Sequence, residues 1–380
     1  MNLRTCVNCR IFKLIMMKNK LFFSAAFSLI SLYANAQAPK YSNEFLAIGV
    51  GARALGMGNA NVASANDVTS GYWNPAGLMY LQSDMQVGLM HSEYFAGIAK
   101  YDFGGFAKKI DSVSSCAFTI IRFGVDDIPN TTELIDAQGN VNYDNITKFS
   151  AADYAFIGSY ARKLKLKGLR VGGNVKIIRR VVGDFAGAWG FGLDAGAMYD
   201  YKKWHFGAVI RDVTSTFNAW SFNLSDDMKQ TFALTGNEIP ANSIELTLPR
   251  LILGASRKYY IKQKFSVMGE LDLDFTFDGR RNTIVSSSFT SIDPHFGFEI
   301  GFKDFIFVRT GLSNMQYVSD FTGQRSLNVQ PNIGLGVRIK QFTIDYALTD
   351  IGDASVALYS NIFSLKFDLH KKAKAQSPSQ

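Results

Sequence analysis

The chain has 380 residues, a formal net charge of +8, and 47% hydrophobic residues that include 31 phenylalanines. Residues 1–36 carry five basic and no acidic side chains, so the remainder has a charge of only +3, which gives no support for nucleic-acid binding. Of three cysteines only Cys116 lies beyond residue 36, which excludes an internal disulfide in that part of the chain.

Residues 1–36 have the pattern of a secretory signal peptide. Two lysines precede an apolar run, and the run closes on Ala34-Asn35-Ala36, so the charged, apolar and cleavage regions follow in the expected order. The apolar run is shorter than the roughly 20 residues of a membrane-spanning helix. We therefore expect export and a mature chain that begins at Gln37. A true start at Met16 or Met17 would make the preceding residues an annotation error.

Residues 37–83 are predicted to form a hatch, a plug inside a barrel. Between residues 43 and 81 there are six glycines among alanines, serines and asparagines, and apolar and polar positions do not alternate. This composition permits close backbone packing but is unsuited to facing lipid. Asn74 precedes Pro75, so it should be extended or in a turn and should end any preceding helix.

Residues 84–370 alternate between apolar and polar positions, the period of β-strands. In Glu270–Asp278, for example, leucines and phenylalanines share one face and acids share most of the other. The predicted strands are long for a soluble protein and suit the roughly 9–11 tilted residues that cross a bilayer. Fourteen segments are predicted: 84–93, 96–109, 113–124, 150–165, 167–182, 186–201, 202–212, 245–260, 263–278, 290–302, 304–315, 328–340, 341–350 and 355–369.

Two architectures fit this alternation, a sandwich with its apolar face inward and a barrel with its apolar face toward lipid. Short turns at Lys202-Lys203 and Lys340-Gln341 contrast with long polar connections at Gly124–Thr147 and Thr214–Asn242, as in outer-membrane barrels. We predict an all-β fold, a transmembrane antiparallel β-barrel of about 14 strands. Its polar faces carry both charge signs, which would form either a paired luminal network or a selective pore wall. Residues 371–380 are expected to be a flexible basic tail.

The remaining features predict no chemistry. The long Thr214–Asn242 connection contains several aromatic side chains, which either bind a partner or cover the barrel mouth and membrane interface. The four histidines are scattered, and no nucleophile motif occurs. We therefore expect no enzymatic activity, no catalytic residue, no cofactor and no metal site.

Two motifs in the hatch segment carry a family resemblance. Gly51-Ala52-Arg53-Ala54-Leu55-Gly56-Met57-Gly58 and Tyr72-Trp73-Asn74-Pro75-Ala76-Gly77-Leu78 resemble the N-terminal signature of the PorV/PorQ family, which belongs to the FadL-like barrels. The resemblance covers about 40 residues. It implies that the following residues are hatch elements: Arg53, Gly56, Gly58, Trp73, Asn74, Pro75, Ala76 and Gly77.

The resemblance implies a non-enzymatic outer-membrane protein of type IX secretion in Bacteroidetes. It would be a cargo shuttle or an accessory barrel that binds C-terminal signal domains. Its partners would be outer-membrane lipid, translocon or attachment-complex proteins, and secreted cargo. The alternative is a FadL-like channel for hydrophobic small molecules, which predicts an apolar pocket beneath the hatch and a lateral opening where a strand bends.

Overall fold

A computed structural model describes residues 42–370, except 132–133, 135–139, 320–322, 350 and 352–358. The predicted signal peptide and basic tail lie outside the described residues. Within the described part of the chain, no helix is both long enough and apolar enough to cross a membrane.

The described residues form one closed antiparallel sheet of seventeen strands. Strand β1 (Met85–Tyr94) pairs with β2 (Ala99–Lys109) on one side and with β17 (Ser360–Leu369) on the other, which closes the ring. The intervening strands are β3 (Ser114–Asn130), β4 (Thr147–Lys163), β5 (Leu169–Val182), β6 (Ala186–Tyr201), β7 (Trp204–Arg211), β8 (Thr216–Phe222), β9 (Ser243–Thr247), β10 (Arg250–Ile261), β11 (Phe265–Thr276), β12 (Val285–Ser286), β13 (Ser291–Phe302), β14 (Ile306–Ser319), β15 (Arg325–Ile339) and β16 (Phe342–Thr349).

The wall has fourteen strand positions, although the described sheet has more strands. Both β7 and β8 pair with β6, and their partners β10 and β9 likewise lie end to end, so each of these pairs is one interrupted wall strand. Strand β12 has only two residues and pairs with β13, and it adds no position to the ring of wall strands. The prediction of a closed β-barrel with about 14 strands is therefore confirmed.

The apolar faces of the strands point outward. In β17, Phe363 and Leu365 are exposed on the outer surface, whereas Ser364 and Lys366 are buried inside. A sandwich would bury the phenylalanines and expose the polar residues, so this orientation excludes it. The apolar outward face instead suits contact with hydrocarbon, because burying apolar side chains in lipid carries no free-energy penalty.

Two predicted connections are partly wrong, because strands continue into them. The wall resumes at β8 after a break at Asp212–Ser215, where both end residues have positive φ, and helix α4 (Asp226–Leu234) follows. Strand β3 likewise runs on to Asn130 past a register shift between Val125 and Ile128. The bulge and the break interrupt the alternation of apolar and polar residues. Strand ends above the bilayer also need no apolar outer face. The sequence pattern therefore predicted loops at these polar strand ends.

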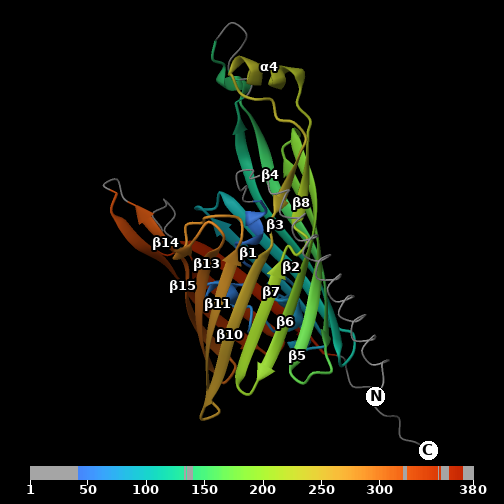
Figure 1. The fold of residues 1–380 in the computed structure, drawn as a ribbon, viewed down its shortest axis with the longest axis vertical. Coiled ribbons are helices and arrows are strands. Elements are labelled where there is room, and N and C mark those ends of the chain that lie inside the picture. Colours follow the sequence, from blue (N-terminus) through green and yellow to red (C-terminus); the bar gives the residue numbers. More distant parts are fainter. Residues whose placement is uncertain are drawn as a thin grey trace, which may run out of the picture. The chain divides into compact units, whose positions relative to one another are not determined.

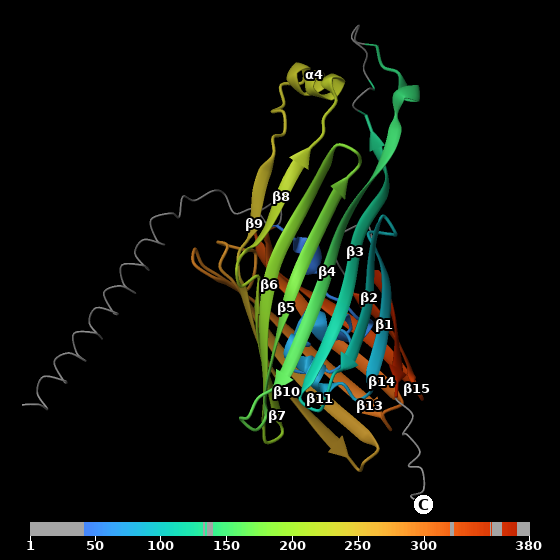
Figure 2. The same cartoon turned by 90° about the vertical axis from the view of Figure 1, so that its right-hand side faces the viewer.

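The two ends of the barrel differ. The predicted short turns at Lys202-Lys203 and Lys340-Gln341 are present and lie at one end. At the other end β3, β4 and β8 rise above the rest of the wall, with α4 beyond them (Figures 1 and 2). Short turns face the periplasm and long connections face the outside in such barrels, so the raised end is extracellular.

The chain before β1 lies inside the barrel, visible as the blue segment in Figures 1 and 2. We call residues 42–83 the luminal segment. Most of its residues are buried. Its elements are the 3-10 turn η1 (Glu44–Leu46), the helices α2 (Ala52–Leu55) and α3 (Ser70–Trp73), and the 3-10 turn η2 (Pro75–Tyr80).

Candidate functional site: the lumen and the extracellular mouth

Glycines on both the segment and the wall allow the luminal segment to pass close to the strands. A Cβ on Gly58, which has φ of 63°, would lie 2.8 Å from the Leu312 backbone nitrogen of β14. A Cβ on Gly56 would lie 2.9 Å from the Gly334 Cα of β15, and one on Gly311 only 2.0 Å from the Met57 carbonyl carbon. Backbone therefore packs on backbone here, which only glycine permits.

The Trp73-Asn74-Pro75 turn is held by polar contacts. Helix α3 ends at Trp73, and Asn74 is extended with φ of −155°, as the following proline predicted. Trp73 donates its indole N–H to the Val50 carbonyl at 2.8 Å. The Asn74 amide donates to the carbonyls of Val62 at 3.0 Å and Ala197 at 3.1 Å, so it joins two parts of the segment to strand β6.

The other motif residues after Asn74 are tightly enclosed. Pro75 and Ala76 pack against Gly172 of β5, where a Cβ would lie 2.6 Å from the Pro75 carbonyl carbon. At Gly77 a Cβ would lie 2.4 Å from the Ala65 carbonyl oxygen. The chain returns on itself at this point, and the space excludes any larger residue.

Arg53 connects the luminal segment to a buried ion-pair network of the wall. Its Nε lies 3.1 Å from Glu299 Oε2, and its Nη1 donates to Asn61 Oδ1 at 2.9 Å. Glu299 is also paired with Arg309 at 2.7 Å, and Arg309 with Asp345 at 2.7 Å. The sequence left two alternatives, a paired luminal network and a selective pore wall. This arrangement is a paired luminal network.

Asp67 extends the network from the other side of the luminal segment. Its carboxylate accepts from Lys366 Nζ at 2.7 Å and from the Thr69 hydroxyl at 2.6 Å. Burial by itself would raise the pKa of Asp67, but the Lys366 ammonium outweighs it and lowers that pKa well below its ordinary value. Lys366 also lies 3.4 Å from Asp345, which joins both sides of the network.

Two carboxylates of β11 bind the backbone of the luminal segment. Asp272 Oδ2 accepts from the N–H groups of Asn61 and Val62, both at 2.8 Å. Glu270 Oε1 accepts from the N–H groups of Ala63 at 2.7 Å and Ser64 at 3.1 Å. Four consecutive amides that form no regular structure are thus paired with two wall residues.

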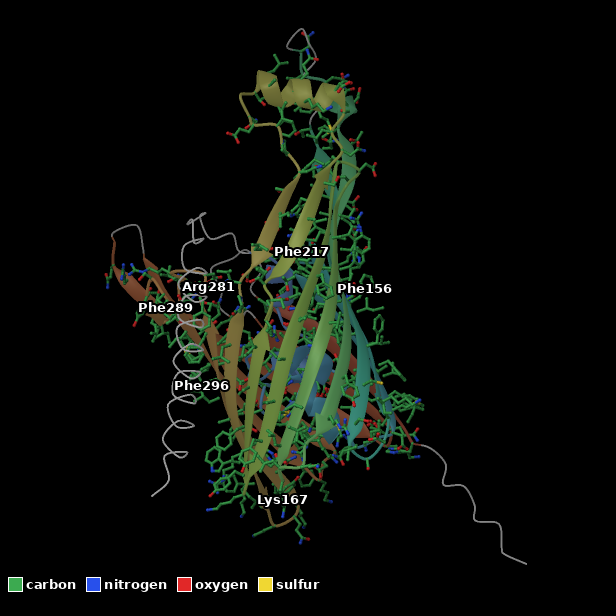
Figure 3. The ribbon with its side chains drawn as sticks, turned by 45° about the vertical axis from the view of Figure 1, so that its right-hand side comes forward. Phe156, Lys167, Phe217, Arg281, Phe289 and Phe296 are labelled. Carbon is green, nitrogen blue, oxygen red and sulfur yellow. The ribbon has the colours of Figure 1, made fainter. Side chains whose placement is uncertain are left out.

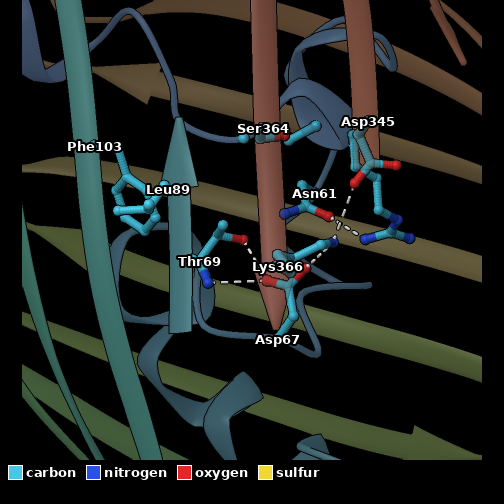
Figure 4. A pocket seen from close by; sticks show the side chains of 12 residues that line it. Asn61, Asp67, Thr69, Leu89, Phe103, Asp345, Ser364 and Lys366 are labelled. Carbon is cyan, nitrogen blue, oxygen red and sulfur yellow. Dashed lines mark hydrogen bonds and ion pairs between the residues drawn. The ribbon is translucent and has the colours of Figure 1, made fainter. Parts of the chain in front are cut away.

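A small hollow lies where the luminal segment meets strands β1, β2, β16 and β17. It lies between Arg53, Asp67, Phe103 and Lys366 and has a volume of about 10 Å³. Figure 4 shows how Asp67, Lys366 and Asp345 fill it from different elements. A volume of about 10–15 Å³ holds one water molecule, so no larger molecule fits there in this conformation.

Larger cavities lie toward the two ends of the barrel. The periplasmic cavity has a volume of about 400 Å³, and many of its lining side chains are charged, among them Lys258, Glu299 and Lys340. The extracellular cavity has a volume of about 480 Å³ and is lined by apolar side chains such as Phe45, Phe95 and Phe123 together with polar ones. We call the latter the mouth cavity.

A model of a protein family described as "Type IX secretion system protein PorV" matches residues 34–246. This match spans more than half of the chain and contains the whole luminal segment. The chain belongs to the PorV family. No curated protein matches the sequence.

Solved structures support the fold of this PorV-family protein. The Ralstonia pickettii toluene transporter TbuX is 14% identical, with a TM-score of 0.52 over 85% of this chain and 99% of its own. The P. putida toluene transporter TodX is 12% identical, with a TM-score of 0.53 over 85% and 99%. A Pseudomonas aeruginosa FadL homologue is 12% identical, with a TM-score of 0.50 over 84% and 98%. The protein thus has the fold of the FadL-like barrels.

The extracellular extension of this PorV-family protein is a sheet with an open edge. Among the described residues, β9 pairs with β8 alone. Glu245 of β9 binds Arg180 at 3.2 Å and the Ser42 hydroxyl at 3.1 Å, which ties the start of the luminal segment to the extension. Beyond it, Leu234 at the end of α4 is 79% exposed.

Sequence reasoning singled out the motif residues as hatch elements, which stays a prediction, and it missed most of their partners. Glu270 and Asp272 appeared only as the polar face of a strand, and Glu299, Arg309 and Lys366 carried no motif. They occupy inward-facing positions of the alternating strands, which marks them as luminal residues. Which amides or ions they contact depends on register across the barrel, for which the sequence holds no local signal. In the described residues, no group of three or more His, Cys, Asp or Glu could hold a metal ion.

Proposed function

We propose that this protein is a non-enzymatic partner of type IX secretion that receives exported proteins at its extracellular face. It binds their C-terminal signal domains and passes them to attachment-complex proteins, next to the translocon. The match to the PorV family over residues 34–246 carries this proposal. We further propose that the luminal segment is a hatch and that Arg53, Asn74 and the neighbouring motif residues keep it closed.

Three structural features support a receptor rather than an open pore. The luminal segment lies inside the barrel with most of its residues buried, and the hollow between it and the wall at Lys366 leaves space for about one water molecule. The mouth cavity combines apolar and polar lining, the mixture found in protein-binding sites. The raised sheet and α4 add exposed surface at the extracellular end of the barrel (Figure 3), where the labelled Phe217 marks β8. A folded domain is too large for the lumen but fits this surface.

Site-specific photo-crosslinking in native outer membranes tests the proposal. A photoreactive residue replaces Leu234 at the end of α4, and a matched one replaces Leu166 in a periplasmic turn; these leucines are 79% and 61% exposed. The first variant should capture proteins that carry type IX C-terminal domains. The second should capture none of them. Equal capture at both ends, or no such proteins at Leu234, refutes the extracellular receptor.

A FadL-like channel for hydrophobic small molecules is the second candidate. The interruption between β7 and β8 at Asp212–Ser215 supports it, because a break in the wall is where a lateral opening would form. The cavity on the periplasmic side counts against it, because charged side chains such as Lys258 and Glu299 line it instead of the apolar pocket that a channel predicts.

Growth of a deletion strain separates the two candidates. A channel predicts slower growth on long-chain lipids or aromatic hydrocarbons, with normal secretion of type IX cargo. The receptor predicts unchanged growth on these carbon sources and loss of cargo from the cell surface. Restoring the gene with Asp272→Ala, which loosens the luminal segment, should alter uptake only if the channel hypothesis is correct.

A further inference from the structure

The outer wall has a large hollow on its membrane-facing side. It has a volume of about 980 Å³ and lies over β7, β10, β11, β13 and β14. Large apolar side chains surround it, among them Phe206, Leu271 and Phe296. Figure 3 marks Phe296 on this part of the barrel.

The strand register explains the hollow. Gly269 of β11 lies between Arg257 of β10 and Phe298 of β13, and a Cβ built on Gly269 meets no atom within 4 Å. Two residues further along β11, on the same outer face, Leu271 lies beside the small Ala255 of β10. Two small residues on adjacent strands therefore lower the surface between rows of aromatic side chains.

A cation lies at one end of the hollow. The Arg257 guanidinium is 5.1 Å from the centre of the Trp204 ring and 4.4 Å from that of Tyr259. Its Nε is buried without a hydrogen-bond partner among the described residues. A buried donor without a partner is unfavourable, so an anionic oxygen at this point would be stabilising.

Arg257 lies close to the periplasmic surface of the membrane. It precedes the periplasmic turn at Lys262-Gln263 by five residues, which is roughly 13 Å in height for a strand of usual rise and tilt. Trp204 and Tyr259 beside it are the residue types that occupy membrane interfaces. A long arginine side chain at this depth reaches the headgroup layer while its stem stays in hydrocarbon.

We propose that this hollow is a binding site for one anionic glycerophospholipid of the periplasmic leaflet. Its phosphate accepts hydrogen bonds from Arg257 between the two aromatic rings. One acyl chain lies along the hollow over Gly269 and Ala255. Charge complementarity selects a lipid. Arg257 is cationic and lies on the outer face of the hollow, whereas Glu270 points into the lumen, and most of the remaining lining is apolar, with Thr310 as a polar exception. A protein strand would leave its backbone groups unpaired in hydrocarbon.

Lipid titration of the purified full-length protein tests the site. Detergent-solubilised protein is titrated with phosphatidylglycerol, and retained lipid is counted by native mass spectrometry. Arg257→Gln should weaken binding about tenfold to hundredfold, because a charge-assisted hydrogen bond is lost. Gly269→Phe, which fills the hollow, should also remove the bound lipid while leaving Arg257 in place.

Matched variants separate this site from general lipid contact. Arg179→Gln is the control for charge, because Arg179 also lies over a tryptophan ring, Trp189, on the outer face near the extracellular end. Gly158→Phe is the control for volume, because a Cβ on Gly158 also meets no atom within 4 Å. Neither control should change binding. Equal losses in test and control variants, or unchanged binding by Arg257→Gln, would overturn the proposal, as would equal affinity for diacylglycerol.

Discussion

Removing the Asp272 carboxylate should free one stretch of the luminal segment. In the native protein the N–H groups of Asn61 and Val62 each lie 2.8 Å from an oxygen of the Asp272 side chain. In Asp272→Ala both N–H groups lose this acceptor. A buried donor left without a partner costs about 1–3 kcal/mol. The two together correspond to about 2–6 kcal/mol, an increase of roughly 30-fold to 10⁴-fold in the open population.

Hydrogen–deuterium exchange of the purified protein measures this opening at the peptide that contains Asn61 and Val62. Local opening controls the exchange of such amides, so the rate should rise by that factor. Asp272→Asn keeps a neutral acceptor and should give a smaller increase. The control is Asp274→Ala on the same face of β11, since Asp274 pairs with Arg250 and not with the segment. An increase below tenfold, or one equal to that of the control, would refute the reasoning.

Three further predictions concern the same segment. Asn74→Ala leaves the buried carbonyls of Val62 and Ala197 without a donor and should lower the unfolding free energy by about 1–3 kcal/mol, measured by denaturant titration. Gly311→Ala forces a Cβ onto the Met57 backbone and should reduce the heat-modifiable folded fraction on gels, whereas Gly158→Ala should not. The folded pKa of Asp67 is lowered, so its contribution is present above the ordinary pKa of about 3.9 and is lost only as pH falls further. Amide exchange near Asp67 should therefore keep the same protection between pH 8 and pH 5 after correction for intrinsic rates, and a loss of protection near pH 5 would contradict this.

Local sequence patterns predicted most of the barrel wall. Each predicted strand coincides with a wall strand, because alternation reports which face of a strand meets hydrocarbon and this requirement applies residue by residue. The prediction failed at Asp212–Ser215 and at Val125–Ile128. At those places a break and a bulge shift the phase, and their cause lies in neighbouring strands.

The candidate site divides in the same way. The glycines and the Asn74-Pro75 pair indicated a compact segment with a turn, since glycine spacing and proline geometry act locally. The acceptors of that segment, such as Glu270 and Asp272, lie about two hundred residues away in the chain. Nothing in the sequence near residues 61–64 specifies them.

The sequence by itself determined that apolar and polar side chains alternate along the chain and that a glycine-rich stretch precedes the strands. Those properties depend on neighbours along the chain. Only the tertiary structure decided that Arg53, Glu299 and Asp67 join one network and that the luminal segment is largely buried inside the barrel. Ring closure and strand register place distant side chains within hydrogen-bond reach, and these follow from the free energy of the whole barrel.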